Sequence, residues 1–222
     1  MERHFDEQLT TLKNTLMKMS SLCELMITDA IRVLCTRETS MIPSISENED
    51  LVNHLQMEID SLCLKLIALY QPTANDLRFI LGAVKTNNDI ERMADMAITI
   101  CRKAERLIEE PTLGAVITSN LSEMTALASV MVKESLSAFV NSQLDKAHVV
   151  LLRDDQLDEM NRRLTRDLMD LMKQDSGTIQ RAVDTLIVVR NLERIGDHAT
   201  NIAENAIFVV NGMDIRHHHD LH

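Results

Sequence analysis

Residues 88–97 of this chain read NDIERMADMA, and residues 190–199 read RNLERIGDHA. The two stretches lie 102 residues apart, measured from Glu91 to Glu193, which is close to half of the 222-residue length. A repeat at this distance indicates one structural unit built twice. Each copy keeps a Glu and an Asp four residues apart, a spacing that places two carboxylates on one helix face, one turn apart.

The repeated carboxylates need a compensating partner. Like charges at this spacing destabilise an isolated helix by roughly 0.2–0.5 kcal/mol. The pairs are Glu91 with Asp95 and Glu193 with Asp197, and a bound cation is the most direct partner for each. The apolar stripe of each helix turns acidic at its pair, which predicts that the carboxylates point toward a neighbouring helix or the groove beside it. Carboxylates placed there are costly unless they are paired or bound to metal.

Composition predicts an all-α protein. The chain is 45% hydrophobic, with only 5 Gly and 3 Pro but 14 Met, and so few helix breakers among helix-forming residues favour helices. Aromatic residues make up only 2%, so we expect an aliphatic core filled by methionine. The net charge of −11 argues against nucleic acid as a partner, because phosphate contacts require clustered Lys and Arg.

Cysteine usage and the N-terminus indicate a cytoplasmic protein. The four cysteines all lie in the first half, and none belongs to a Cys-x-x-Cys pair, so they read as reduced core thiols. The N-terminus has no apolar signal region, and no run approaches the ~18 apolar residues that a membrane span requires. We therefore expect that the chain does not cross a membrane.

Apolar residues in steps of three and four predict six long helices without any strand. Breaker residues separate the helices, because Pro cannot continue a helix and Gly, Asn, Asp and Ser favour its ends. The predicted breaks lie around Pro43, at 71–75, at 110–114 and at 175–178. The helices group into two tandem three-helix bundles related by the internal repeat.

The segment Glu110–Gly114 is the best domain boundary. We expect a first three-helix bundle in residues 1–110, a second in residues 111–216, and a His-rich tail in residues 217–222. The histidines of the tail could hold a metal ion, but a frayed tail without chemistry is the favoured interpretation.

The middle helix of each half supplies oxygen ligands to face the repeated pairs. Glu49 and Asn53 are four residues apart near the start of the second helix, and Asp154 and Asp158 occupy the equivalent place in the fifth. Two such pairs on adjacent helices would give several ligands to one cation cluster. Oxygen-only ligation suits Mg²⁺, Mn²⁺, Ca²⁺ or iron better than zinc or copper. Because Asn53 is neutral, we expect the first site to bind metal more weakly.

Two other interpretations stay open on these residues. Acidic pairs on helices are mostly solvated or paired with cations, and Arg92 and Arg194 directly follow the glutamates, so the chain could be a helical adaptor with incidental acid pairs. The second open interpretation is a carboxylate-metal enzyme of the di-iron type. The chain lacks the Glu-x-x-His that ferritin-like di-iron proteins use, and it has no Gly-rich phosphate loop or nucleophile motif. We therefore expect no catalytic residues.

The chain resembles the phosphate-uptake regulator family, PhoU. The resemblance covers nearly everything from His4 to Arg216 and rests on the turn QPTANDLR at 71–78 combined with the two Glu-Arg-x-x-Asp motifs. It implies two tandem three-helix bundles, and multinuclear metal sites at the repeated acidic motifs, usually with iron or other divalent cations. Magnesium, manganese and zinc stay open as alternatives to iron. Carried over to this sequence, the ligands are Glu91, Asp95, Glu193 and Asp197, faced by Glu49, Asn53, Asp154 and Asp158.

The resemblance also implies a function. Family members are not enzymes; they act with the cytoplasmic subunits of a phosphate ABC transporter and a sensor histidine kinase. They repress the phosphate-starvation response and restrain phosphate uptake. Homodimers are common, and membrane association is peripheral, through those partners. A role with a different phosphate carrier remains the alternative. Ala94 stands where the second copy has Gly196, and Asn88 where it has Arg190, so the two sites need not hold the same metal load.

Overall fold

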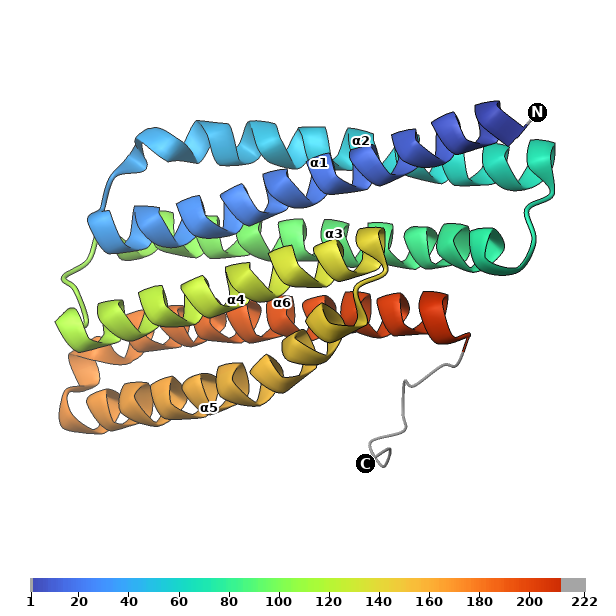
Figure 1. Cartoon of the computed structure of the whole chain (residues 1–222). Helices are drawn as coiled ribbons and strands as arrows, with labels where there is room; N and C mark the ends of the chain where they lie inside the picture. The colour runs from blue at the N-terminus through green and yellow to red at the C-terminus, as the bar shows by residue number, and fades with distance from the viewer. Residues whose placement is uncertain (1, 213–222) are drawn as a thin grey trace.

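The structure, a computed structural model, describes residues 2–212 as six long helices and two short 3-10 turns, with no strand in that range (Figure 1). This confirms the predicted all-α fold of two tandem three-helix bundles. The predicted tail at 217–222 lies outside the described residues. The helices are α1 (Glu2–Thr36), α2 (Ile42–Tyr70), α3 (Ala74–Leu107), α4 (Ala115–Asn141), α5 (Leu144–Gln174) and α6 (Ile179–Asn211), and the turns are Thr39–Met41 and Ser176–Thr178.

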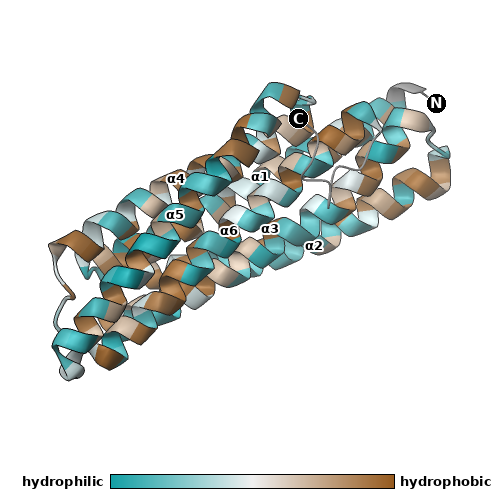
Figure 2. Ribbon diagram, turned by 90° about the horizontal axis from the view of Figure 1, so that it is seen from below, coloured by the Kyte–Doolittle hydropathy of each residue, from teal (hydrophilic) through white to brown (hydrophobic). Residues whose placement is uncertain are grey.

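The two bundles share one elongated core. α1–α3 form the first bundle and α4–α6 the second; α3 and α6 lie side by side along the middle, and α1 packs against α4 (Figure 1). α2 and α5 occupy the two outer flanks. Buried residues of both halves form a single hydrophobic cluster. Hydrophilic and hydrophobic bands interleave along the helices (Figure 2), as expected for helices that bury one face and expose the other.

Left-handed residues end four of the helices; α1 stops before Arg37, whose φ is 62°. α2 stops at Gln71, whose φ of 48° turns the chain while its N–H donates to the carbonyl of Ile67. Pro72 follows and cannot continue the helix. Ser142 ends α4 with a φ of 56°. α6 ends at Gly212 with a φ of 71°, a conformation that costs glycine least because it has no Cβ.

Polar contacts fix α3 and α6 in one antiparallel register. Residue numbers that increase along α3 pair with residue numbers that decrease along α6, so the centres of the two helices lie side by side. Both acidic repeats are therefore held near the middle of the molecule. The three contacts are Arg78 Nε to Val209 O (3.2 Å), Asp89 Oδ1 to His198 Nδ1 (2.8 Å) and Lys103 Nζ to Asp184 Oδ1 (2.6 Å).

The Lys103–Asp184 ion pair is the most buried of these contacts. The side chain of Asp184 is 7% exposed and that of Lys103 is 21% exposed. Although burial opposes ionisation, hydrogen bonds from Lys103 and Gln180 keep the pKa of Asp184 below its ordinary value. A paired carboxylate of this kind stays charged at neutral pH, and it ties the first bundle to the second far from the acidic repeats.

One helix passes a composition test for a membrane span. By length and composition α4 could cross a membrane, with a mean hydropathy of 1.3 over its best window. It contains no run of about 18 consecutive apolar residues, so it differs from the span that the sequence analysis looked for. In the structure α4 packs against α1, α5 and α6, and it buries side chains such as Met124, Ala128 and Met131. Its apolar character is therefore that of a core helix, which passes the same test.

All four cysteines are free, as predicted. Cys23, Cys63 and Cys101 are buried, and Cys35 is partly buried. Burial raises the pKa of all three buried thiols, that of Cys63 to about 12. Thiols held in this protonated form are poor nucleophiles, so they act as small core residues.

Candidate metal centres

Four predicted ligands of the second half gather where α5 passes α6. Asp154 and Asp158 come from α5, and Glu193 and Asp197 come from α6. Burial raises the pKa of Asp154 to about 6, with further contributions from the charges of Asp197, Asp158, Asp155 and Glu193. Carboxylates that disfavour one another's ionisation form a site that a cation would stabilise.

The pKa values of the two α6 carboxylates are raised by the same surroundings. Burial and then the negative charges of Asp197 and Asp158 raise the pKa of Glu193. Burial and then Asp158 raise the pKa of Asp197. The structure thus brings the four predicted residues of this half into one electrostatic unit, the second acidic cluster, Asp154, Asp158, Glu193 and Asp197.

The first acidic cluster joins α2 to α3 and comprises Glu49, Glu91 and Asp95. Burial, and then the charge of Asp95, raise the pKa of Glu91, and the two carboxyl groups share a hydrogen bond. Burial raises the pKa of Glu49, which also feels Asp95. Asn53 lies half-buried on α2, one turn after Glu49. The cluster therefore repeats the second one with one charge fewer.

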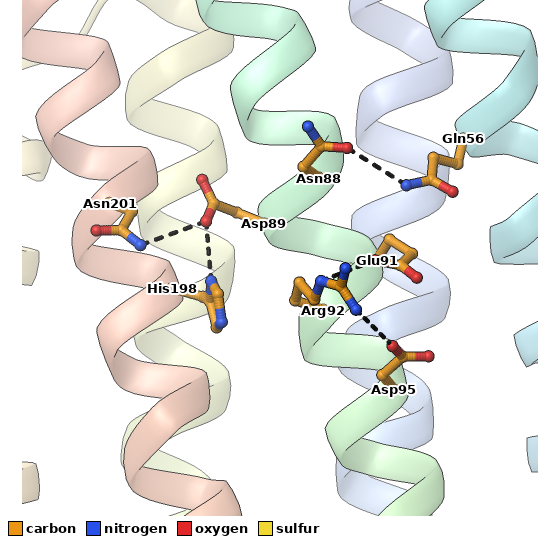
Figure 3. A network of polar contacts seen from close by, with 8 residues as sticks. All are labelled: Gln56, Asn88, Asp89, Glu91, Arg92, Asp95, His198 and Asn201. Carbon is orange, nitrogen blue, oxygen red and sulfur yellow. Dashed lines mark hydrogen bonds and ion pairs between the residues drawn. The ribbon is translucent and has the colours of Figure 1, made fainter.

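Arginine pairing distinguishes the two clusters. Arg92 lies between the first pair, with its guanidinium 3.3 Å from Asp95 Oδ2 and 3.6 Å from Glu91 Oε2 (Figure 3). In the second half, Arg194 forms no salt bridge with Glu193 or Asp197 within residues 2–212. The first pair is thus partly neutralised by a salt bridge on its own helix. The charges of Arg190 and Arg194 act on Glu193 and Asp197 without a salt bridge, so they compensate the second pair less directly.

Both clusters lie on half-exposed flanks of their helices. The α6 stripe that was predicted to face a neighbour includes Val183 at 40% exposure and the exposed Asp197, and on α3 the stripe includes Leu81 at 45% exposure. The core faces of α3 and α6 lie to one side of these stripes. That the carboxylates point toward a neighbouring helix or the groove beside it stays a prediction: Glu91, Asp95 and Glu193 are half-buried, and Asp197 is exposed.

The donor chemistry of the clusters fits a hard cation. The donors are carboxylate and amide oxygens, which suit Mg²⁺, Mn²⁺, Ca²⁺ or iron. In residues 2–212, no three His, Cys, Asp or Glu side chains stand close enough to hold an ion as they are. Binding would therefore require the carboxylates to rotate toward a common point, which a cation favours by removing their mutual repulsion.

A second polar network lies beside the clusters and was not predicted. His198 follows Asp197, but its Nδ1 lies 2.8 Å from Asp89 Oδ1 on α3, and the amide of Asn201 donates to the same oxygen at 3.3 Å (Figure 3). This places the imidazole at the α3–α6 interface, away from the carboxylates it follows in sequence. The contact depends on the register between the two halves, which one sequence does not reveal.

The metal affinity of the second cluster is expected to fall as the pH is lowered through about 6, the pKa of Asp154, because metal ligands must be deprotonated. Without metal the pH dependence of stability has the opposite sign. A carboxyl whose folded pKa exceeds its unfolded value takes up protons on folding, so unfolding free energy decreases as pH rises from about 4 to 6. Mn²⁺ titrations and thermal melts at pH 5, 6 and 7.5 measure both effects. In Asp154→Asn the metal-free stability should lose this slope; an unchanged slope would contradict the assignment.

Comparison with known proteins agrees with the duplicated fold. The model of the PhoU domain matches the chain twice, at residues 16–104 and 121–206. A phosphate-specific transport system accessory protein PhoU homolog of Clostridium acetobutylicum is 34% identical over 95% of this chain and 96% of its own length. The homolog of Pseudomonas aeruginosa is 33% identical over 98% and 89%.

Solved structures give the same result. The crystal structure of PhoU from Pseudomonas aeruginosa superposes with a TM-score of 0.88 at 33% identity, covering 94% of this chain and all of that one. The phosphate transport system regulatory protein PhoU from Streptococcus pneumoniae superposes with a TM-score of 0.86 at 27% identity, covering 95% and 98%.

Proposed function

This chain belongs to the PhoU family, and we propose that it is an accessory protein of a phosphate-specific transport system. Its proposed role is to restrain phosphate uptake and to repress the phosphate-starvation response when phosphate is plentiful. The observation that carries the proposal is the match along nearly the whole chain to relatives named as phosphate-specific transport accessory proteins. These relatives are named as accessory proteins, which supports a non-enzymatic role.

The proposed mechanism is that of a metal-binding adaptor. Glu49, Glu91 and Asp95 would hold one cation cluster with Asn53, and the second acidic cluster would hold the other. A bound cation would supply local positive charge and cross-link two helices in each half. The ordered helical faces would then dock on cytoplasmic subunits of a phosphate ABC transporter and on a sensor histidine kinase. We further propose a cytoplasmic homodimer that reaches the membrane only through these partners.

The acidic clusters are expected to be required for repression. In a deletion strain of the source organism grown in high phosphate, the wild-type chain should repress a phosphate-starvation reporter and limit uptake of labelled phosphate. The variant Glu91→Gln/Asp95→Asn/Glu193→Gln/Asp197→Asn should leave the reporter at its starvation level, because it keeps side-chain volume but removes the charges that would hold a cation.

A matched control exchanges exposed acidic residues away from the clusters, Glu123→Gln with Asp145→Asn, which should repress normally. Thermal melts of the purified proteins show whether each variant is folded. Normal repression by the four-residue variant would make the clusters structural only and would remove the metal-dependent part of the proposal. Failure of the wild-type chain to repress would overturn the regulatory function itself.

A further inference from the structure

An arginine-rich groove runs between α5 and α6, next to the second acidic cluster. Arg162 and Arg166 line it from α5 and Arg190 lines it from α6, and its volume is about 750 Å³. The surrounding protein carries a net charge of −11, so this groove reverses the prevailing sign. We name it the arginine groove after these three residues.

The two α5 guanidinium groups are held in place by one carboxylate. Arg162 Nη1 donates to one oxygen of Glu159 at 2.9 Å, and Arg166 Nη2 donates to the other at 3.2 Å. Both groups are more than half exposed, so each retains donors that face the groove. Glu159 thus orients the two arginines and neutralises only one of them.

Arg190 completes the groove from the opposite helix. It is exposed, and it forms no salt bridge or hydrogen bond with another side chain within residues 2–212. The three arginines face the carboxylates of Glu159 and Asp158, which leaves one guanidinium charge in excess along the groove. Oriented donors on one wall and an exposed guanidinium on the other can contact an oxyanion from two sides.

The arginine groove is absent from the other half of the chain. By the offsets that align the two halves, Met57 and Ser61 stand where α5 has Arg162 and Arg166, and Asn88 stands where α6 has Arg190. The duplicated architecture therefore does not require these arginines. They occur in one copy of a unit whose other copy folds without them, which separates the groove from the repeated acidic clusters.

We infer that the arginine groove binds a phosphate oxyanion, free or carried by a small organic molecule. Guanidinium groups bind phosphate through paired charge-assisted hydrogen bonds, and the side chains of Asn161 and Thr165 line the same groove with further hydrogen-bonding groups. Pockets for small molecules measure roughly 300–1,000 Å³, so this groove has room for a phosphate ester. Its lining offers charge and hydrogen bonds rather than an aromatic face, so the phosphate group itself must be the recognised feature.

Phosphate binding in the arginine groove would give the proposed adaptor a direct contact with a phosphate ligand. The biological role of this binding rests on the proposed function, but the binding itself does not. Arg162 also lies 3.6 Å from Asp158 of the second acidic cluster. Occupancy of the groove would therefore act on a side chain that belongs to the candidate metal centre.

Equilibrium dialysis of the full-length chain tests the inference. The protein is stripped of metal with a chelator, desalted, and titrated separately with labelled inorganic phosphate and with AMP. We expect saturable binding of one ligand per chain for at least one probe, weakened roughly tenfold or more in Arg166→Gln/Arg190→Gln, because each lost charge-assisted hydrogen bond weakens binding by about that factor. The probe that binds tells whether the source is free or esterified phosphate.

Arg163→Gln is the matched control, because Arg163 is a neighbouring exposed arginine of α5 that bonds to Asn120 instead; its binding should equal that of wild type. Binding of neither probe, or equal losses in the control and groove variants, would overturn the inference. So would binding of an acidic peptide without either phosphate probe, which would make the groove a protein-docking surface. The reporter assay separates these failures from the proposed function, because wild-type repression can persist while phosphate binding is absent.

Discussion

Exchanging Glu193 for Gln and Asp197 for Asn is expected to weaken metal binding by about 100-fold or more. Loss of a residue that only supports a metal ligand already lowers metal affinity by about 10- to 100-fold, and these two residues are proposed ligands themselves. The same exchange at Glu91 and Asp95 should cost far less. In the second cluster Arg162 pairs with Asp158 at 3.6 Å, but no arginine forms a salt bridge with Glu193 or Asp197 within residues 2–212. In the first, Arg92 already pairs with both Glu91 and Asp95. A cation must displace that arginine before it can use the first pair.

Elemental analysis and Mn²⁺ titration of protein truncated after Arg216 measure this difference without interference from the terminal histidines. Arg92→Gln provides an independent check, because freeing Glu91 and Asp95 from their ion pair should strengthen the first site. Equal losses from the two double variants would show that arginine pairing does not rank the sites. The absence of stoichiometric metal in wild type would leave the helical adaptor interpretation standing.

The helices could be predicted because their determinants are local. Three-four spacing of apolar residues and breakers such as Pro43 and Gly114 set the predicted segments, and the structure places helix ends close to them. The assembly of Glu193 and Asp197 beside α5 was also predictable, because the repeat shows which residues occupy equivalent places, at an offset of 102 residues for α6 and 105 for α5.

Contacts that depend on helix register or on side-chain conformation could not be predicted in this way. The Asp89–His198 contact depends on how α3 meets α6, and a register between distant helices leaves no periodic signal in one sequence. Arg92 and Arg194 are equivalent in sequence, yet within residues 2–212 Arg92 forms salt bridges with Glu91 and Asp95 while Arg194 forms none with Glu193 or Asp197. The difference lies in the side-chain conformations of the two arginines. The arginine groove could not be predicted, because the repeat indicates only what the two halves share, and the counterpart of Arg190 is Asn88.

Gly196→Ala is expected to destabilise the chain by about 1–2 kcal/mol and to weaken metal binding at the second cluster. Alanine alone would favour the helix by about 1 kcal/mol, so the sign depends on packing. A Cβ at position 196 would lie 2.2 Å from Leu157 Cδ2, and Leu157 is only 1% exposed. Overpacking of this kind costs about 1–3 kcal/mol, or displaces α5, which carries Asp154 and Asp158 on either side of Leu157.

The first half of the chain suggests the compensating change. Its counterparts of Gly196 and Leu157 are Ala94 and Val52, so a larger residue on one helix accompanies a smaller one on the other. Leu157→Val in the Gly196→Ala background should therefore restore stability to the wild-type level, whereas Leu157→Val alone should destabilise by about 1 kcal/mol through a cavity. Urea denaturation of the four proteins gives the coupling between the two positions. If the two substitutions lower the unfolding free energy additively, the contact between α5 and α6 is not what requires glycine at position 196. Packing would then not explain why the first motif has Ala94 and the second has Gly196.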